Sequence, residues 1–127
     1  MTREDLADRA HAYLAALDRL DLEAVLGFFS DEASLAIRTA HREFVGREEI
    51  RGLWSEILSA HSRMRHAVKD TVVDEDARKV VTVQSFRGEL ASGGIEERCS
   101  VYVFELDEHG VFSRVAVWID GATPAQP

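Results

Sequence analysis

The sequence predicts an α+β fold in which three N-terminal helices pack on one face of a curved, mainly antiparallel sheet. Two observations support this prediction. Apolar residues recur at helical spacing through much of residues 6–58, whereas the stretches after residue 63 are rich in Val, Phe and Tyr and are separated by short turn-forming segments. Because short links join antiparallel neighbours, this segregation of helices and strands is typical of α+β domains.

Length and composition limit the class of protein. The chain has 127 residues, about the size of one domain, and a formal net charge of −8. Its 15 basic residues are scattered among 23 acidic ones, and binding to phosphates needs a basic footprint, so we expect no nucleic-acid partner. No apolar run approaches the roughly 18 residues that span a bilayer, and the start lacks the apolar region of a secretory signal. We therefore expect no membrane partner and a cytoplasmic location.

Three segments carry helical periodicity. The first covers residues 6–17, and a shorter second helix, capped by Asp21, is expected to run through Phe29. The third follows Gly46 and has the strongest helical spacing in the chain. Its apolar residues are Ile50, Leu53, Trp54, Ile57 and Leu58. Asp18 falls in the last turn of the first helix, where the macrodipole disfavours a negative charge by roughly 0.3–1 kcal/mol, so its presence there requires an explanation.

Six segments are candidate strands. Residues 34–38 and 41–45 are short and could pair with each other. The remaining four form a predicted meander over residues 64–73, 79–90, 95–106 and 111–119. We expect one domain over residues 1–121 and a flexible C-terminal tail over residues 122–127.

The order of these elements resembles the SnoaL-like group of the nuclear-transport-factor-two-like superfamily. Three motifs carry the resemblance: YLAALDRLDLEAVLGFFSDEA at residues 13–33, FVGREEIRGLW at 44–54 and GVFSRVAVWID at 110–120. It implies a cone-shaped fold that encloses an apolar pocket, and it implies a homodimer. Members include polyketide cyclases, ketosteroid isomerase, limonene epoxide hydrolase, scytalone dehydratase and non-catalytic binding domains, so the fold alone does not select a reaction.

Two of these reactions require residues that the chain lacks at the matching positions. Tyr13 matches the tyrosine of ketosteroid isomerase, but Ile37 and Ser100 stand where that enzyme has its base and its acid. Arg98 matches the arginine of limonene epoxide hydrolase, but Ser100 and Val117 replace the two aspartates. We therefore expect neither mechanism.

Scytalone dehydratase and the related dehydrochlorinases match better. In these enzymes a strand histidine acts as the base, and an aspartate at the end of the first helix orients it. The resemblance assigns these roles to His66 and Asp18, with Tyr13 or Ser100 as a hydrogen-bond donor to a developing oxyanion. A carboxylate that accepts one imidazole N–H fixes the tautomer and stabilises the imidazolium, which would explain Asp18. A purely structural His66 and an exposed His66 remain alternatives.

Further side chains are predicted to line the apolar pocket, because they match positions that face it in the family. They are Phe29, Ile37, Trp54, Arg98, Ser100, Tyr102, Val115 and Val117. The aromatic members also suit an ordinary place in the core. Arg98 also suits a surface ion pair with Glu96 or Glu97.

The two faces of the last two strands are both apolar, so the second face of the sheet is expected to be covered by a second copy of the chain. By the family's register, Ser113 faces the pocket, whereas Phe112 and Trp118 face the convex side. Trp118 is therefore the predicted anchor of a homodimer. The single cysteine, Cys99, excludes an internal disulfide and is expected to be buried.

No metal site and no cofactor are predicted. The five histidines lack the spacing of metal ligands, and no glycine-rich phosphate loop occurs. His61, at a helix end, is explained by the favourable macrodipole alone. The sequence predicts a protein that binds a small hydrophobic metabolite and, if catalytic, acts as a lyase, isomerase or cyclase by His–Asp proton abstraction. The alternative is a non-catalytic ligand-binding or dimerisation module of the same fold.

Overall fold

The computed structural model describes residues 1–121, and the predicted tail at residues 122–127 lies outside the described residues. The helices are α1 (Arg3–Asp18), α2 (Leu22–Leu26) and α3 (Arg47–Ser59), with a short 3-10 helix, η1 (Arg38–Ala40). The strands are β1 (Phe29–Ile37), β2 (Arg42–Val45), β3 (His61–Asp74), β4 (Lys79–Leu90), β5 (Ile95–Leu106) and β6 (Phe112–Ile119). The predicted α+β architecture is confirmed.

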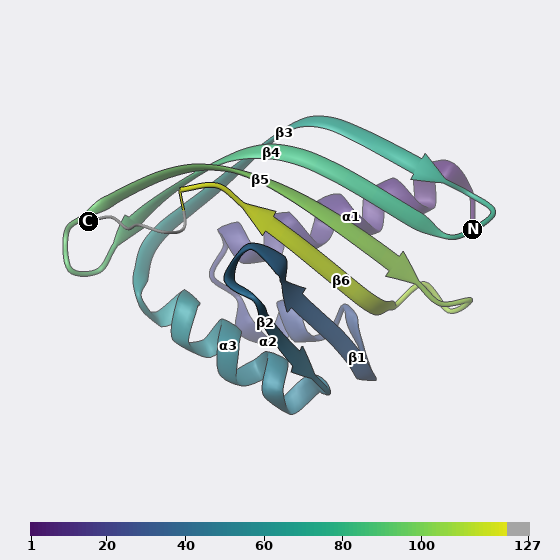
Figure 1. Ribbon diagram of the computed structural model, residues 1–127, viewed down its shortest axis with the longest axis horizontal. Coiled ribbons are helices and arrows are strands. Elements are labelled where there is room, and N and C mark those ends of the chain that lie inside the picture. The colour runs from purple at the N-terminus through teal and green to yellow at the C-terminus, as the bar shows by residue number, and fades with distance from the viewer. Residues whose placement is uncertain (122–127) are drawn as a thin grey trace.

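The strands form one curved sheet in the order β2-β1-β6-β5-β4-β3. Strands β3 to β6 are the predicted antiparallel meander, and β1 joins it by pairing parallel to β6. The long strands β3, β4 and β5 arch over α1, while α3 lies near β1 and β2 (Figure 1). The helices therefore cover the concave face and leave the convex face open.

Both N-terminal helices begin at residues that cap free backbone N–H groups. The hydroxyl of Thr2 accepts from the N–H of Asp5, and the Asp5 carboxylate accepts in return from the N–H of Thr2. Asp21 caps α2, as predicted, by accepting from the N–H of Ala24. In the part of the chain that the structure describes, no helix has both the length and the apolar character needed to cross a membrane.

The core is an aromatic cluster centred on Tyr13. Its ring centroid lies 5.3–6.3 Å from six other aromatic rings, each in an edge-to-face arrangement. These rings belong to Phe28, Phe29, Trp54, Tyr102, Phe104 and Phe112. The cluster therefore joins α1 to α3 and to strands β1, β5 and β6.

The prediction that the second helix continues through Phe29 is wrong. Helix α2 ends at Leu26, and Phe29 is the first residue of β1. The N–H of Phe112 donates to the carbonyl of Phe28 at 2.8 Å, and this bond fixes the chain beside β6. Sheet pairing thus overrides the local helical periodicity.

The last strand departs from the predicted alternation at its start. Phe112 is fully buried in the aromatic cluster, whereas Ser113 is exposed and donates a hydrogen bond to the carbonyl of Glu105. Both facings are the reverse of the prediction, because the register between β5 and β6 shifts beside Glu105, as at a β-bulge. Beyond the shift Val117 is buried, and Trp118 is 42% exposed.

The convex face of the sheet carries an apolar row. Val101 pairs with Val83 on one side and with Trp118 on the other. Val83 is 38% exposed. Cys99 lies on the same strand as Val101 and is exposed, so the prediction of a buried thiol is wrong. The reason is that the helices pack only against the concave face.

Candidate active site

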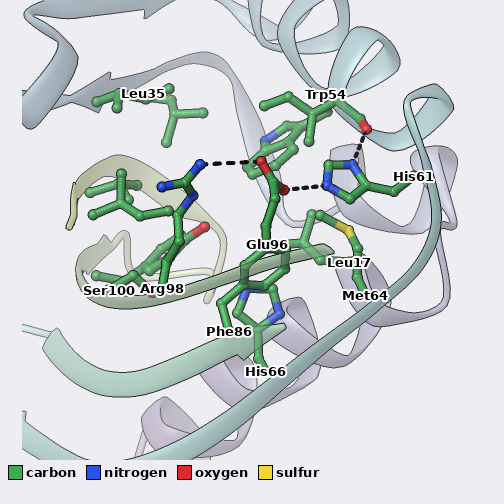
Figure 2. Close-up of a pocket in the computed structure, with 15 residues that line it drawn as sticks. Leu17, Leu35, Trp54, His61, Met64, His66, Phe86, Glu96, Arg98 and Ser100 are labelled. Carbon is green, nitrogen blue, oxygen red and sulfur yellow. Dashed lines mark hydrogen bonds and ion pairs between the residues drawn. The ribbon is translucent and has the colours of Figure 1, made fainter. Parts of the chain in front are cut away.

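A cavity of about 210 Å³ lies between α3 and the concave face of the sheet. It is larger than the roughly 150 Å³ apolar cavity that holds a benzene molecule. Its wall is mainly apolar and comes from α1, α3 and every strand except β2. His61, His66, Glu96, Arg98 and Ser100 interrupt this wall with polar groups (Figure 2), and Tyr102 adds a phenol hydroxyl.

Most of the side chains predicted to line the pocket lie on this cavity. Those on its wall are Ile37, Trp54, Arg98, Ser100, Tyr102 and Val117. Phe29, Val115 and Tyr13 are instead fully buried in the core and are not part of the wall. Burial raises the pKa of Tyr13 well above its ordinary value, and the neighbouring Tyr102 adds to the effect. The Tyr13 hydroxyl therefore stays protonated inside the aromatic cluster.

Asp18, at the end of α1, holds His66 on β3. Its Oδ1 lies 2.6 Å from Nδ1 of the imidazole, and its two oxygens accept from the backbone N–H of His66 at 3.1 and 2.9 Å. An ionised carboxylate only accepts, so Nδ1 carries a proton and donates it to Asp18. The His66 side chain is 5% exposed. The bonds from β3 offset the unfavourable position of Asp18 in the helix macrodipole.

Replacing Asp18 by alanine should lower the free energy of unfolding by about 1–3 kcal/mol, because the N–H groups of His66 would lose their acceptor. Asp18→Asn should lower it less, since the amide oxygen can still accept from the backbone. Urea unfolding followed by tryptophan fluorescence would measure both variants. Equal losses would contradict a role for Asp18 as the hydrogen-bond acceptor that joins α1 to β3.

A second polar cluster lies elsewhere on the cavity wall and is drawn with its hydrogen bonds in Figure 2. His61 places Nδ1 2.7 Å from the carbonyl oxygen of Ile57 and Nε2 2.8 Å from Oε1 of Glu96. The other oxygen of Glu96 lies 3.3 Å from Nη2 of Arg98. The predicted ion pair of Arg98 with Glu96 is present, but it lies on the cavity wall and not on the outer surface.

Sequence reasoning missed His61 as a cavity residue. Its position at the end of α3 offered a sufficient explanation, and 35 residues separate it from Glu96. One signal was available in the sequence. Glu96, Arg98 and Ser100 occupy every second position of β5, so all three share one face of the strand. That face is the one that lines the cavity.

Glu96 is stabilised in its ionised form. Burial alone would raise its pKa, but hydrogen bonds from His61 and then Arg98 outweigh burial and lower the pKa below the ordinary value of 4.5. A carboxyl group with a lowered pKa in the folded state stabilises the fold above its unfolded pKa. That contribution is lost as the pH falls through the folded pKa.

The difference in unfolding free energy between the wild type and Glu96→Gln should therefore shrink as the pH is lowered below about 4.5. Glutamine keeps the shape of the side chain but does not titrate. Urea unfolding of both proteins across the acid range would measure the difference. A gap that widens in acid would show that ionised Glu96 does not stabilise the fold.

Two hydroxyl groups of β5 complete the polar part of the wall. The hydroxyl of Ser100 accepts from the side-chain amide of Gln84 at 2.8 Å. Burial raises the pKa of Tyr102, and the charge of Asp18 adds to this effect. Tyr102 therefore remains a neutral hydroxyl group that can donate to a ligand.

The groups on the wall are suited to proton transfer, since they include two histidines that each contact a carboxylate. Within residues 1–121, no three side chains of His, Cys, Asp or Glu are grouped so that they could hold a metal ion.

Known proteins of the same fold resemble this chain along nearly its whole length. It is 27% identical over 119 residues to austinoid biosynthesis cluster protein H of Aspergillus calidoustus, which covers 86% of this chain and 78% of that protein. The structure of AusH from Aspergillus nidulans superposes with a TM-score of 0.85 at 26% identity and covers 96% of this chain and 88% of that one. BvnE pinacolase from Penicillium brevicompactum shares the fold, with a TM-score of 0.83, 20% identity and coverage of 94% and 89%. Since residues 10–115 match the family described as the SnoaL-like domain, this protein belongs to the SnoaL-like family.

Proposed function

We propose that this protein binds a small, largely hydrophobic molecule and abstracts a proton from one of its carbon atoms. Such a step starts isomerisation, cyclisation or elimination. The observation that carries the proposal is that His66, which lines an apolar cavity, places its Nδ1 2.6 Å from Oδ1 of Asp18. With Nδ1 protonated, Nε2 can take a proton from the ligand, and Asp18 stabilises the imidazolium that forms.

The names of two similar proteins support a role in small-molecule metabolism. One is a pinacolase, and another is a protein of an austinoid biosynthesis cluster. We infer from this likeness that the chain acts in the biosynthesis of a small molecule.

Exchange of carbon-bound protons provides a test that does not require the natural substrate. Cyclohexanone suits the cavity, because it is close in size to benzene, which fits a cavity of roughly 150 Å³. We expect the protein to accelerate exchange of the protons next to the carbonyl group in D₂O, followed by NMR. Binding without acceleration would favour the alternative, a non-catalytic ligand-binding module. Failure of both binding and exchange would contradict the proposal.

We also propose that a second copy of the chain covers the convex face. The apolar row of Val83, Val101 and Trp118 supports this, because an apolar surface of this kind is costly when it is left in water.

Trp118→Asp should weaken the dimer roughly thirtyfold or more, since a central tryptophan in an interface contributes about 2 kcal/mol or more. Analytical ultracentrifugation would measure the dissociation constant. Val45→Asp, a change at an apolar residue of β2 that is 56% exposed, is the matched control and should leave the dimer intact. A monomeric wild type would refute this interface.

A further inference from the structure

A proton lies between Nε2 of His61 and Oε1 of Glu96. Nδ1 of His61 lies 2.7 Å from the carbonyl oxygen of Ile57, which only accepts, so Nδ1 carries one proton. Nε2 lies 2.8 Å from Oε1 of Glu96, and two lone pairs at that distance would repel each other. A second proton must therefore lie between them. Arg98, beside the other carboxylate oxygen, favours ionised Glu96 and so assigns this proton to Nε2.

Packing holds the His61 ring in this position. The side chain is 8% exposed, and its ring centroid lies 6.1 Å from that of Phe86. Gly88 makes room for both rings. A Cβ atom at position 88 would lie 2.9 Å from Cδ2 of His61 and 2.8 Å from Cζ of Phe86. Because Gly88 pairs with Glu96 across β4 and β5, the missing side chain lets His61 reach the carboxylate.

Phe86 also contacts the other histidine, His66, with 5.0 Å between the ring centroids. The cavity thus has two histidines beside one phenylalanine. His66 donates its Nδ1 proton to one carboxylate, Asp18, and the proposed function uses its Nε2 as the base. His61 has a proton on each ring nitrogen and lies with Glu96 and Arg98 in a cluster whose charges sum to a positive value.

We propose that His61 is the general acid of this pocket and that the substrate carries a carbonyl or hydroxyl oxygen at the His61 end of the cavity. The proposal rests on the proposed function, in which His66 takes a proton from carbon. A substrate oxygen replaces Oε1 of Glu96 as the acceptor of the Nε2 proton. Arg98 keeps its hydrogen bond to the other carboxylate oxygen of Glu96.

The same two proton transfers serve a substrate with a carbonyl group and one with a hydroxyl group. With a ketone, Nε2 of His66 takes a proton from the neighbouring carbon, the C–H electron pair forms the C=C bond of an enol, and the carbonyl oxygen takes the proton of His61. With a hydroxyl group on the next carbon, the same electron pair forms the double bond, the C–O bond breaks, and the oxygen leaves as water with that proton. His66 then loses its proton to solvent, and His61 regains one.

The protonation state can be measured without any ligand. In ¹⁵N NMR spectra near neutral pH, we expect both ring nitrogens of wild-type His61 to be protonated. In Glu96→Gln the amide can donate to Nε2, so we expect that nitrogen to lose its proton while the side-chain shape is kept. A wild-type spectrum with an unprotonated Nε2 on His61 would overturn the proposal.

The oxygen contact can be measured with bound cyclohexanone. We expect its carbonyl stretch to lie at lower frequency in the wild type than in His61→Phe, because a charged donor weakens the C=O bond. His61→Phe should also slow α-proton exchange by about 10²–10⁴-fold, mainly through kcat. Gly88→Ala should displace the His61 ring without changing any charge. It should therefore raise the carbonyl stretch and slow the exchange, both to a smaller extent than His61→Phe.

Asp18→Asn separates this proposal from the proposed function. It should slow exchange but leave the carbonyl stretch of the bound ketone unchanged, since it acts on His66. A stretch that is the same in the wild type and His61→Phe would refute the role of His61, even if exchange depends on His66. Exchange that depends on His61 but survives the loss of His66 would instead refute the proposed base.

Discussion

Replacing His66 by glutamine should slow the α-proton exchange of cyclohexanone by about 10²–10⁴-fold. Glutamine can still donate a hydrogen bond to Asp18, but its amide nitrogen has no basic lone pair with which to take a proton. The backbone N–H of residue 66 keeps both of its contacts with Asp18, at 3.1 and 2.9 Å, so α1 remains joined to β3. NMR in D₂O at saturating ketone would measure the rate.

His11→Gln is the matched control for this prediction. His11 is exposed on α1, where its Nε2 lies 2.9 Å from the hydroxyl of Thr71, and it is not part of the cavity wall. Its replacement should leave exchange at the wild-type rate. If both variants exchange as fast as the wild type, His66 is not the base. Equal losses in the two variants would point to a general effect on the fold.

Tyr13→Ala should lower the free energy of unfolding by about 3–5 kcal/mol, the range found when a buried aromatic side chain is removed from a core. Tyr13 is fully buried and contacts six aromatic rings, which come from α3, from three strands and from the turn before β1. Its removal would leave a cavity where α1 meets the sheet. Thermal and urea unfolding would give the size of the loss.

Tyr13→Phe distinguishes the packing of this ring from any use of its hydroxyl group. The hydroxyl is buried, and the described part of the chain offers it no hydrogen-bond partner. Phenylalanine should therefore keep the stability within about 1 kcal/mol, since no hydrogen bond is lost, and should keep the exchange rate. A large loss of exchange in this variant would restore the role of Tyr13 as an oxyanion donor, which the family resemblance implies.

The element types could be predicted because they depend on local patterns. Helical spacing in residues 47–59 and alternation in the strands reflect which faces of each element are buried. The errors arose where a distant pairing overrides the local pattern. Phe29 has helical spacing but joins the sheet beside β6, and the bulge next to Ser113 depends on the register with β5. Neither pairing has a local signature in the sequence.

Only part of the candidate site could be predicted from the sequence. Asp18 could be identified because its place in the helix is electrostatically unfavourable, and the resemblance supplied His66 as its partner. His61 had a sufficient local explanation at the end of α3. Its contact with Glu96 depends on the space that Gly88 leaves on the neighbouring strand.

The order of helices and strands could be derived from the sequence alone, because it follows from residue type and short-range periodicity. The resemblance carried by this order implied the apolar pocket. The polar side chains that meet in the cavity are brought together by the three-dimensional fold. Asp18 and His66 are 48 residues apart, and His61 and Glu96 are 35 apart. Contacts across such separations depend on strand register and on the docking of helices against the sheet, and periodicity specifies neither.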